Sequence, residues 1–186
     1  MFEYFLHQAR GWRVLAHIVA PIVWFQTALL MTGVYPTYNA SQGVQPMEEM
    51  PFFSGEFAAT RLDAIMASGH EQTAFVFYGL DLVNAVLIAA GLAAIIGFGL
   101  RSFHREGRLA RLALLAPLAL VCAEFIENGL LATALALPAS REALGAAAGI
   151  AAGAKFLCFG AAALLALIAA IVGGYTRALH LLRPRQ

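Results

Sequence analysis

Four long stretches of the chain are almost entirely apolar, and short segments rich in charged side chains separate them. The stretches cover about residues 14–34, 74–100, 109–137 and 143–175. Each has the roughly 20 mostly apolar residues that a helix needs to cross the hydrocarbon of a bilayer. The pattern predicts an all-α, polytopic membrane protein, a four-transmembrane-helix bundle that forms one membrane domain over residues 1–186.

A shorter amphipathic segment lies between the first and second stretches. Ser54 has the side chain of a helix N-cap, Leu62 belongs to an apolar stripe, and Gly69 is a typical helix stop. We expect a helix over about 54–68 on the outer surface, after an irregular loop over 35–53. Two roles remain open for this helix, a peg packed on the rim of the bundle or a lid hinged next to Gly69.

The N-terminal segment also mixes apolar and charged side chains. Residues 2–13 predict a short interfacial helix leading into the first span. Arg10 and Arg13 before an apolar run are also typical of a signal peptide, but the run is long and no small-x-small cleavage site closes it. A retained first span is the favoured interpretation.

The charged residues outside the apolar stretches indicate an orientation. Nine of the twelve basic residues precede the first stretch, join the second to the third, or follow the fourth. They are Arg10, Arg13, Arg101, Arg105, Arg108, Arg111, Arg177, Arg183 and Arg185. The connection 35–72 is acidic and has a single base, Arg61. The positive-inside rule therefore predicts that both termini are cytoplasmic. Abundant Arg, Ala and Leu with a single Lys are typical of a GC-rich bacterial genome, which indicates a bacterial inner membrane.

Composition excludes several classes of function. The chain is 61% hydrophobic with a net charge of +1, and its basic residues are spread over the ends of the spans, so we expect no nucleic acid partner. Cys122 and Cys158 lack the spacing of a redox motif. No cluster has metal-ligand spacing, and no cofactor is specified by the sequence.

Six polar side chains interrupt the apolar stretches. They are Asp81, Asn84, Glu124, Glu127, Asn128 and Lys155. Asp81 and Asn84 are one helical turn apart, and the three polar residues of the third stretch follow at i, i+3 and i+4, so each set shares a helix face. Such groups are costly in hydrocarbon and mark candidate ligand-binding sites.

Depth and charge give this site a predicted form. Counting about 1.5 Å per residue from the basic segments places Asp81, Glu127 and Lys155 in the outer half of the membrane and Glu124 closest to the midplane. We expect an outward-facing funnel with Glu124 deepest and Asp81 and Lys155 near the mouth. Three carboxyl groups and one ammonium group leave at least one carboxyl group to hold a proton, bind a cation or face water. Alternatively, Asp81 and Lys155 snorkel to the interface and Asn128 joins two helices.

Glycines form a separate motif in the fourth stretch. Gly145, Gly149 and Gly153 repeat every four residues, a double Gly-x-x-x-Gly pattern that is typical of tight helix packing. Lys155 does not share this face. The pattern indicates a helix-packing surface for a neighbouring helix, a second copy of the chain or a larger membrane complex.

The order of several motifs resembles a widespread group of small bacterial four-helix membrane proteins. The motifs are the outer helix with its glycine turn, Tyr78-x-x-Asp81, Pro117 and Glu127-Asn128, within residues 54–138. The resemblance implies the four-helix fold. It also implies that Asp81, Glu127 and Asn128 match site positions of that group, but it implies no activity. The group often has Asp at the position of Glu124.

The sequence is compatible with three functions. The first is binding of a lipid, small molecule or cation, with membrane lipids as partners. The second is an accessory subunit that docks through the Gly149 face. The third is an intramembrane enzyme in which Glu124 or Glu127 acts as acid or base, Asn128 orients the substrate and Lys155 stabilises negative charge.

Overall fold

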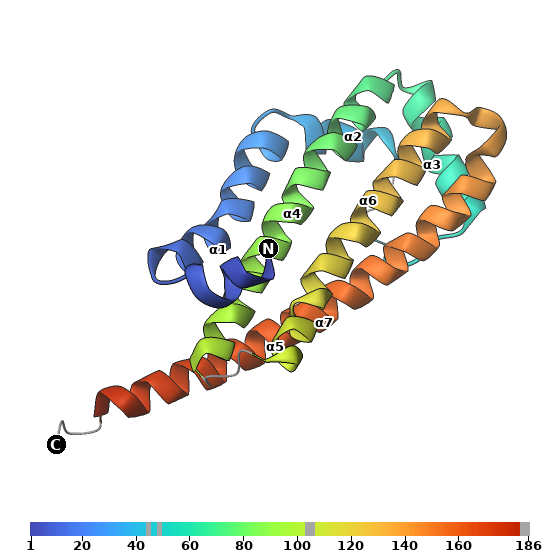
Figure 1. Cartoon of the computed structure of the whole chain (residues 1–186). Coiled ribbons are helices and arrows are strands. Elements are labelled where there is room, and N and C mark those ends of the chain that lie inside the picture. The colour runs from blue at the N-terminus through green and yellow to red at the C-terminus, as the bar shows by residue number, and fades with distance from the viewer. Residues whose placement is uncertain (44–45, 48–49, 103–106, 183–186) are drawn as a thin grey trace.

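The computed structural model describes residues 1–43, 46–47, 50–102 and 107–182. Over these residues the chain is helical without strands, and four helices are long and apolar enough to cross a membrane (Figure 1). They span Trp12–Leu30, Glu71–Ser102, Arg111–Ala136 and Pro138–Leu179. The prediction of an all-helical protein with four apolar spans is confirmed.

The elements follow one another along the chain, and the longest connection, residues 42–54, joins α2 to α3. They are η1 (Tyr4–Gln8), α1 (Trp12–Trp24) continued by η2 (Phe25–Leu30), α2 (Val34–Ser41), α3 (Gly55–Ala67), α4 (Glu71–Ser102), α5 (Arg108–Ala113), α6 (Leu115–Ala136), η4 (Pro138–Ser140) and α7 (Arg141–Leu182).

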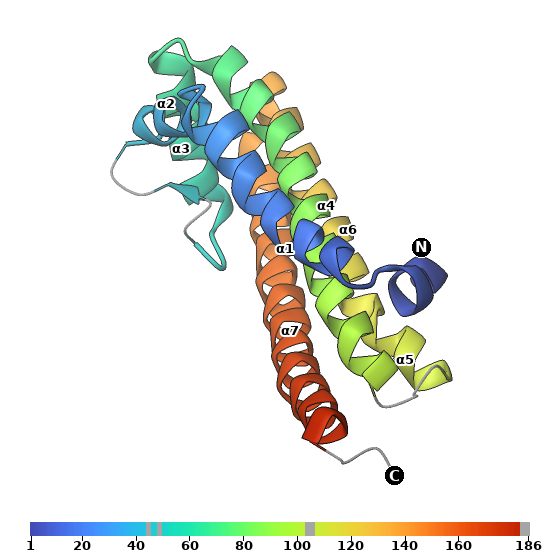
Figure 2. The ribbon, with the colours of Figure 1, turned by 90° about the vertical axis from the view of Figure 1, so that its left-hand side faces the viewer.

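Three of the long helices, α4, α6 and α7, pack against one another, and α1 packs mainly on α4 (Figure 1). Helices α2 and α3 lie together near one end, where α3 contacts α7 (Figure 2). This end carries the connection predicted to be outer. Helix α7 has 42 residues and a length of about 63 Å, so it exceeds the hydrocarbon thickness of a bilayer.

Small residues on α4 allow close contact with its neighbours. A Cβ atom at Gly91 would lie 2.8 Å from the carbonyl oxygen of His17, and one at Gly97 would overlap the carbonyl oxygen of Phe5. A Cβ atom at Gly99 would lie 2.5 Å from the Cβ of Ala169 on α7. The glycines of α4 therefore let the N-terminal segment, α1 and α7 approach its backbone.

The N-terminal helix is shorter than predicted and is fixed at its C-terminal end. The guanidinium of Arg101 donates hydrogen bonds to the carbonyl oxygens of Phe5, Leu6 and Ala9. These carbonyls lack partners within the short helix, so Arg101 caps them. Gly11, with φ of 52°, then separates η1 from α1.

The third span is broken near its start. The sequence predicts one helix over 109–137 with a bend near Pro117, but the structure has α5 and α6 separated at Leu114. Proline lacks an N–H group and its ring clashes with the carbonyl of the fourth residue before it. That residue is Ala113, the last of α5.

The helix predicted over about 54–68 is confirmed as α3, while the loop before it is partly helical. The Ser54 side chain accepts a hydrogen bond of 3.1 Å from the backbone N–H of Phe57, and Gly69 ends the helical segment with φ of 72°. The loop prediction is wrong for Val34–Ser41, which forms α2. Tyr38 explains this difference, because its buried ring stacks on Phe77 at 4.1 Å and packing overrides the local loop signals.

The glycine stripe of α7 is a packing surface inside the chain. Gly145 lies against Ala58 of α3, Gly149 against the Phe53 backbone, and all three glycines are buried. Gly153 lies against the ring of Phe52. The chain itself therefore covers the face that the sequence offered to a second copy or a larger complex.

Helix α3 packs on this surface of α7. Leu62 and Ile65 of α3 are fully buried in the cluster of apolar residues at the end predicted to be outer, which we call the outer apolar core. At the adjoining start of α7, the buried guanidinium of Arg141 donates to the carbonyl oxygens of Ala134 and Leu135 at 3.2 and 3.3 Å and forms an ion pair with Asp63 of α3. Arg141 thus caps the end of α6 and joins it to α3.

Replacing Gly149 by alanine is expected to destabilise the protein. The added methyl group would overlap the Phe53 carbonyl, and such overpacking costs about 1–3 kcal/mol. The Gly160→Ala variant is the matched control, because a Cβ there meets no atom within 4 Å and the change raises helix stability by up to about 1 kcal/mol. Thermal unfolding in detergent measures the stability of both variants. Equal melting temperatures for Gly149→Ala and Gly160→Ala would contradict the packing role of Gly149.

The Arg141→Ala variant is expected to lose about 1–3 kcal/mol, because two carbonyl oxygens lose their buried donor. The Asp63→Asn variant tests the ion pair alone. The Asp63 side chain is 66% exposed, so this change should lower the free energy of unfolding by no more than about 1 kcal/mol. Chemical unfolding of both variants in the same detergent checks the order, and a larger loss for Asp63→Asn would refute it.

Candidate functional site

Five of the six predicted polar residues meet in the interior. The Lys155 ammonium lies 2.6 Å from Oε2 of Glu127 and 3.5 Å from Oε1 of Glu124. The side-chain amide of Asn128 donates to Oδ2 of Asp81 and to Oε1 of Glu124, each at 3.3 Å. We call these five residues the polar network.

Three helices supply the polar network. Asp81 comes from α4, Lys155 from α7, and the other three members from α6. The i, i+3, i+4 spacing on α6 turns its polar side chains toward both neighbours. Glu124, Glu127 and Asn128 are 6%, 2% and 4% exposed, so the network is buried between the helices.

Asn84 lies outside the hydrogen bonds of the network. Its side-chain oxygen is buried, and none of the described residues donates a hydrogen bond to it. The helical turn that relates Asn84 to Asp81 gives them a similar face but not a shared contact. The sequence prediction that places Asn84 in the same site is not supported by these contacts.

The alternative in which Lys155 snorkels to the interface is wrong for this structure. Its side chain is only 13% exposed and points to two carboxylates in the interior. Asn128 does join two helices, as that alternative expected, because its amide reaches Asp81 on α4.

Packed side chains lie between the polar network and the end of the molecule predicted to be outer, where we expected a funnel. One turn outward from Asp81, Asn128 and Lys155 lie Tyr78, Leu131 and Ala152 respectively, and all three are buried in the outer apolar core. The hydroxyl of Tyr38 on α2 donates to that of Tyr78 at 3.1 Å. Packed side chains therefore close the outward direction.

A cavity instead adjoins the polar network on its opposite, inward side. It has a volume of about 210 Å³ and is lined by Ala85, Ile88, Leu120, Glu124, Lys155, Phe156 and Phe159. Ala85 is one turn inward from Asp81, Leu120 from Glu124, and Phe159 from Lys155. Phe156 and Phe159 are 38% and 43% exposed, so the cavity reaches the side of the molecule.

The network contains more carboxyl groups than cations. Lys155 contacts Glu124 and Glu127, whereas Asp81 has a hydrogen bond from Asn128 and no ion pair within the described ranges. No group of three or more His, Cys, Asp or Glu side chains among the described residues is arranged to hold a metal ion. The polar network therefore contains three carboxyl groups and one ammonium group.

The aromatic wall of the cavity was not predicted from the sequence. Phe156 and Phe159 lie in an unbroken apolar stretch, where aromatic residues carry no distinct signal. The i+4 spacing of Phe159 from Lys155 is the one indication that the sequence contains.

The fold and this site define an all-helical protein with four candidate membrane spans and a buried charged network between three of them. Comparisons with protein-family models, with curated proteins and with solved structures found no match. The resemblance to small four-helix bacterial membrane proteins stays a prediction from motifs.

The Lys155→Met variant is expected to be strongly destabilised, by about 3–5 kcal/mol, because removing one partner leaves buried carboxylates without their cation. The double variant Lys155→Met with Glu127→Gln should recover part of this loss, since it also removes one charge. Leu157→Met, at a position 70% exposed on the same helix, controls for the new side chain. Melting temperatures in detergent measure the effects; wild-type stability of Lys155→Met would refute the role of the ion pair.

Proposed function

We propose that the protein binds the ammonium group of an amphiphilic molecule inside the membrane, at the cavity lined by Glu124 and the two phenylalanines. The observation that carries this proposal is the excess of carboxyl groups next to an aromatic, laterally open cavity. Carboxylates and aromatic rings both attract an ammonium ion.

The size of the cavity limits what it accepts. At about 210 Å³ it is below the roughly 300–1,000 Å³ of pockets that enclose a whole drug-sized ligand. It therefore suits the polar end of a molecule whose apolar remainder stays in the bilayer. Phe156 and Phe159 line the exposed side of the cavity, through which such a molecule would enter.

Each residue of the network has a distinct part in this proposal. Glu124 accepts hydrogen bonds from the bound ammonium and stands on the cavity wall. Asp81 adds negative charge behind it, and Asn128 holds both carboxyl groups in position. Glu127 lies closest to Lys155 and offsets its charge, which reduces repulsion of the incoming cation.

We also propose the membrane arrangement that this function requires. The four spans cross a bacterial inner membrane as one bundle, with both termini in the cytoplasm, and lipids surround it. The support is the concentration of arginines at one end of the spans and the apolar exposed face of α1, which includes Leu15, Ile22 and Val23.

The two other functions have less support. An accessory subunit would need a docking face other than that of Gly149, which Phe53 covers. An enzyme would have acid and base groups in Glu124 and Glu127, but the sequence contains no nucleophile motif or phosphate loop beside them.

Thermal unfolding of the purified protein with added amphiphiles tests the proposal. Dodecylamine at 100 times its dissociation constant should stabilise the protein by about 2.7 kcal/mol, while dodecanol, which lacks the charge, should have a much smaller effect. Phosphatidylethanolamine in mixed micelles distinguishes a lipid ligand from a free amine.

The Glu124→Gln variant should lose this stabilisation. Glu142→Gln, an exposed carboxylate at the start of α7, is the matched control and should keep it. Equal stabilisation by dodecanol and dodecylamine, or full stabilisation of Glu124→Gln, would refute ammonium recognition.

A further inference from the structure

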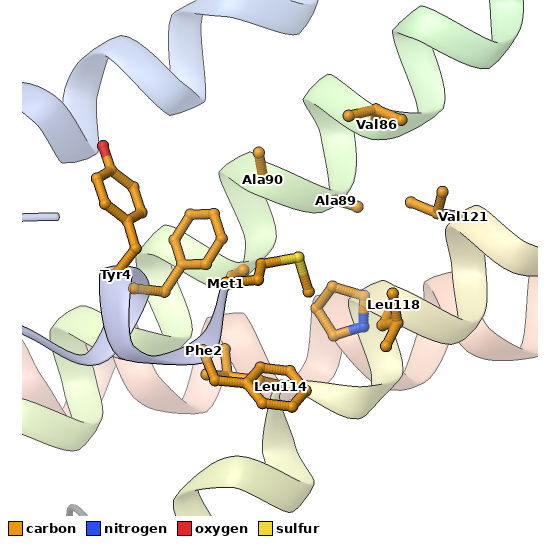
Figure 3. A pocket seen from close by; sticks show the side chains of 12 residues that line it. Met1, Phe2, Tyr4, Val86, Ala89, Ala90, Leu114, Leu118 and Val121 are labelled. Carbon is orange, nitrogen blue, oxygen red and sulfur yellow. The ribbon is translucent and has the colours of Figure 1, made fainter. Parts of the chain in front are cut away.

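A second and larger cavity lies between the N-terminal segment, α4 and α6 (Figure 3). Its volume is about 460 Å³. Ala89 and Ala90 of α4 form one wall, and Leu118 and Val121 of α6 form another. Phe2 and its neighbours in the N-terminal segment cover one end. This cavity shares no lining residue with the one beside the polar network.

The walls of this cavity are suited to hydrocarbon. None of the lining residues has a charged side chain, and Tyr4 is the one with a hydroxyl group. Figure 3 shows that hydroxyl pointing away from the residues of α4 and α6. A water molecule needs two to four polar partners, which these walls do not offer.

The position along the spans indicates which part of the membrane surrounds the cavity. Ala93 on its wall precedes Arg101 by about 12 Å along α4, and Leu118 follows Arg111 by about 10 Å along α6. The cavity therefore lies just inside the arginine-bearing end of the spans, at the depth of lipid acyl chains next to the headgroups.

The charge at this end complements an anionic headgroup. The described residues there include six arginines and one acid, Glu3. The arginines are Arg10, Arg13, Arg101, Arg108, Arg111 and Arg177. Glu3 forms an ion pair of 2.9 Å with Arg111, and Arg101 holds the carbonyls of η1. The N-terminal segment is thus fixed as a cover by two of the arginines, and the local charge remains positive.

We propose that this cavity binds one acyl chain of an anionic phospholipid, whose phosphate group lies among the arginines at the same end. The N-terminal segment covers the chain and fastens it between α4 and α6. This inference goes beyond ammonium recognition at the polar network and does not depend on it, because the two cavities are separate.

Photoaffinity labelling of the wild-type protein tests the proposal directly. The probe is phosphatidylglycerol with a diazirine in the middle of one acyl chain, incorporated into phosphatidylcholine nanodiscs. We expect adducts on peptides from residues 1–5, 86–93 and 114–121. Unlabelled phosphatidylglycerol should compete at least tenfold better than phosphatidylcholine. Adducts confined to the exposed face of α7, or equal competition by the two lipids, would overturn the proposal.

A variant that fills the cavity gives an independent readout. Ala90→Phe should reduce these adducts at least tenfold, because the new ring occupies the space between α4 and α6. Ala170→Phe makes the same change at an exposed position of α7 and should leave labelling unchanged. The Glu124→Gln variant should also label normally, which separates this site from the polar network. Undiminished labelling of a folded Ala90→Phe variant would overturn the assignment.

Discussion

The structure depends on the need to pair charged groups that lie away from water. Lys155 on α7 approaches two glutamates of α6, and Asn128 of α6 extends the contact to Asp81 on α4. Leaving one of these charges unpaired in an apolar interior is costly, so the contacts admit little sliding of one helix along another. The register of α4, α6 and α7 follows from this network. The outer apolar core and the close contact of Gly99 with α7 are then built on that register.

Much of the fold could be predicted because it depends on local pattern. Apolar length identified the four spans, and the Ser54 cap and the Gly69 stop identified α3. The features that were missed depend on contacts between distant residues. Helix α2 forms because Tyr38 packs on Phe77, and Arg141 has a structural role because α3 places Asp63 beside it. The two partners of each contact are far apart in the sequence, so a short segment never contains both.

The candidate site could be predicted in its members but not in its direction. Helical periodicity placed the three polar residues of α6 on one face, and the cost of charge in hydrocarbon indicated that Lys155 would find them. Depth counting then suggested an opening toward the end that carries α3, whereas the cavity lies on the opposite side of the network. Depth gives the level of a side chain, whereas the open side depends on the size of its neighbours. Tyr78 and Leu131 fill the space on one side, and Ala85 leaves space on the other.

The place of Lys155 in the last long helix has a consequence for biosynthesis. Synthesis runs from the N-terminus, so Asp81 and then the two glutamates of α6 are made before their cation exists. Until Lys155 is made, the two glutamates lack the ammonium group that lies beside them in the folded structure. Arrival of α7 supplies the ammonium group and the glycine stripe that receives α3. Helix α7 therefore brings the one cation of the network, and α4 and α6 gain their compensating charge only after the chain has passed Lys155.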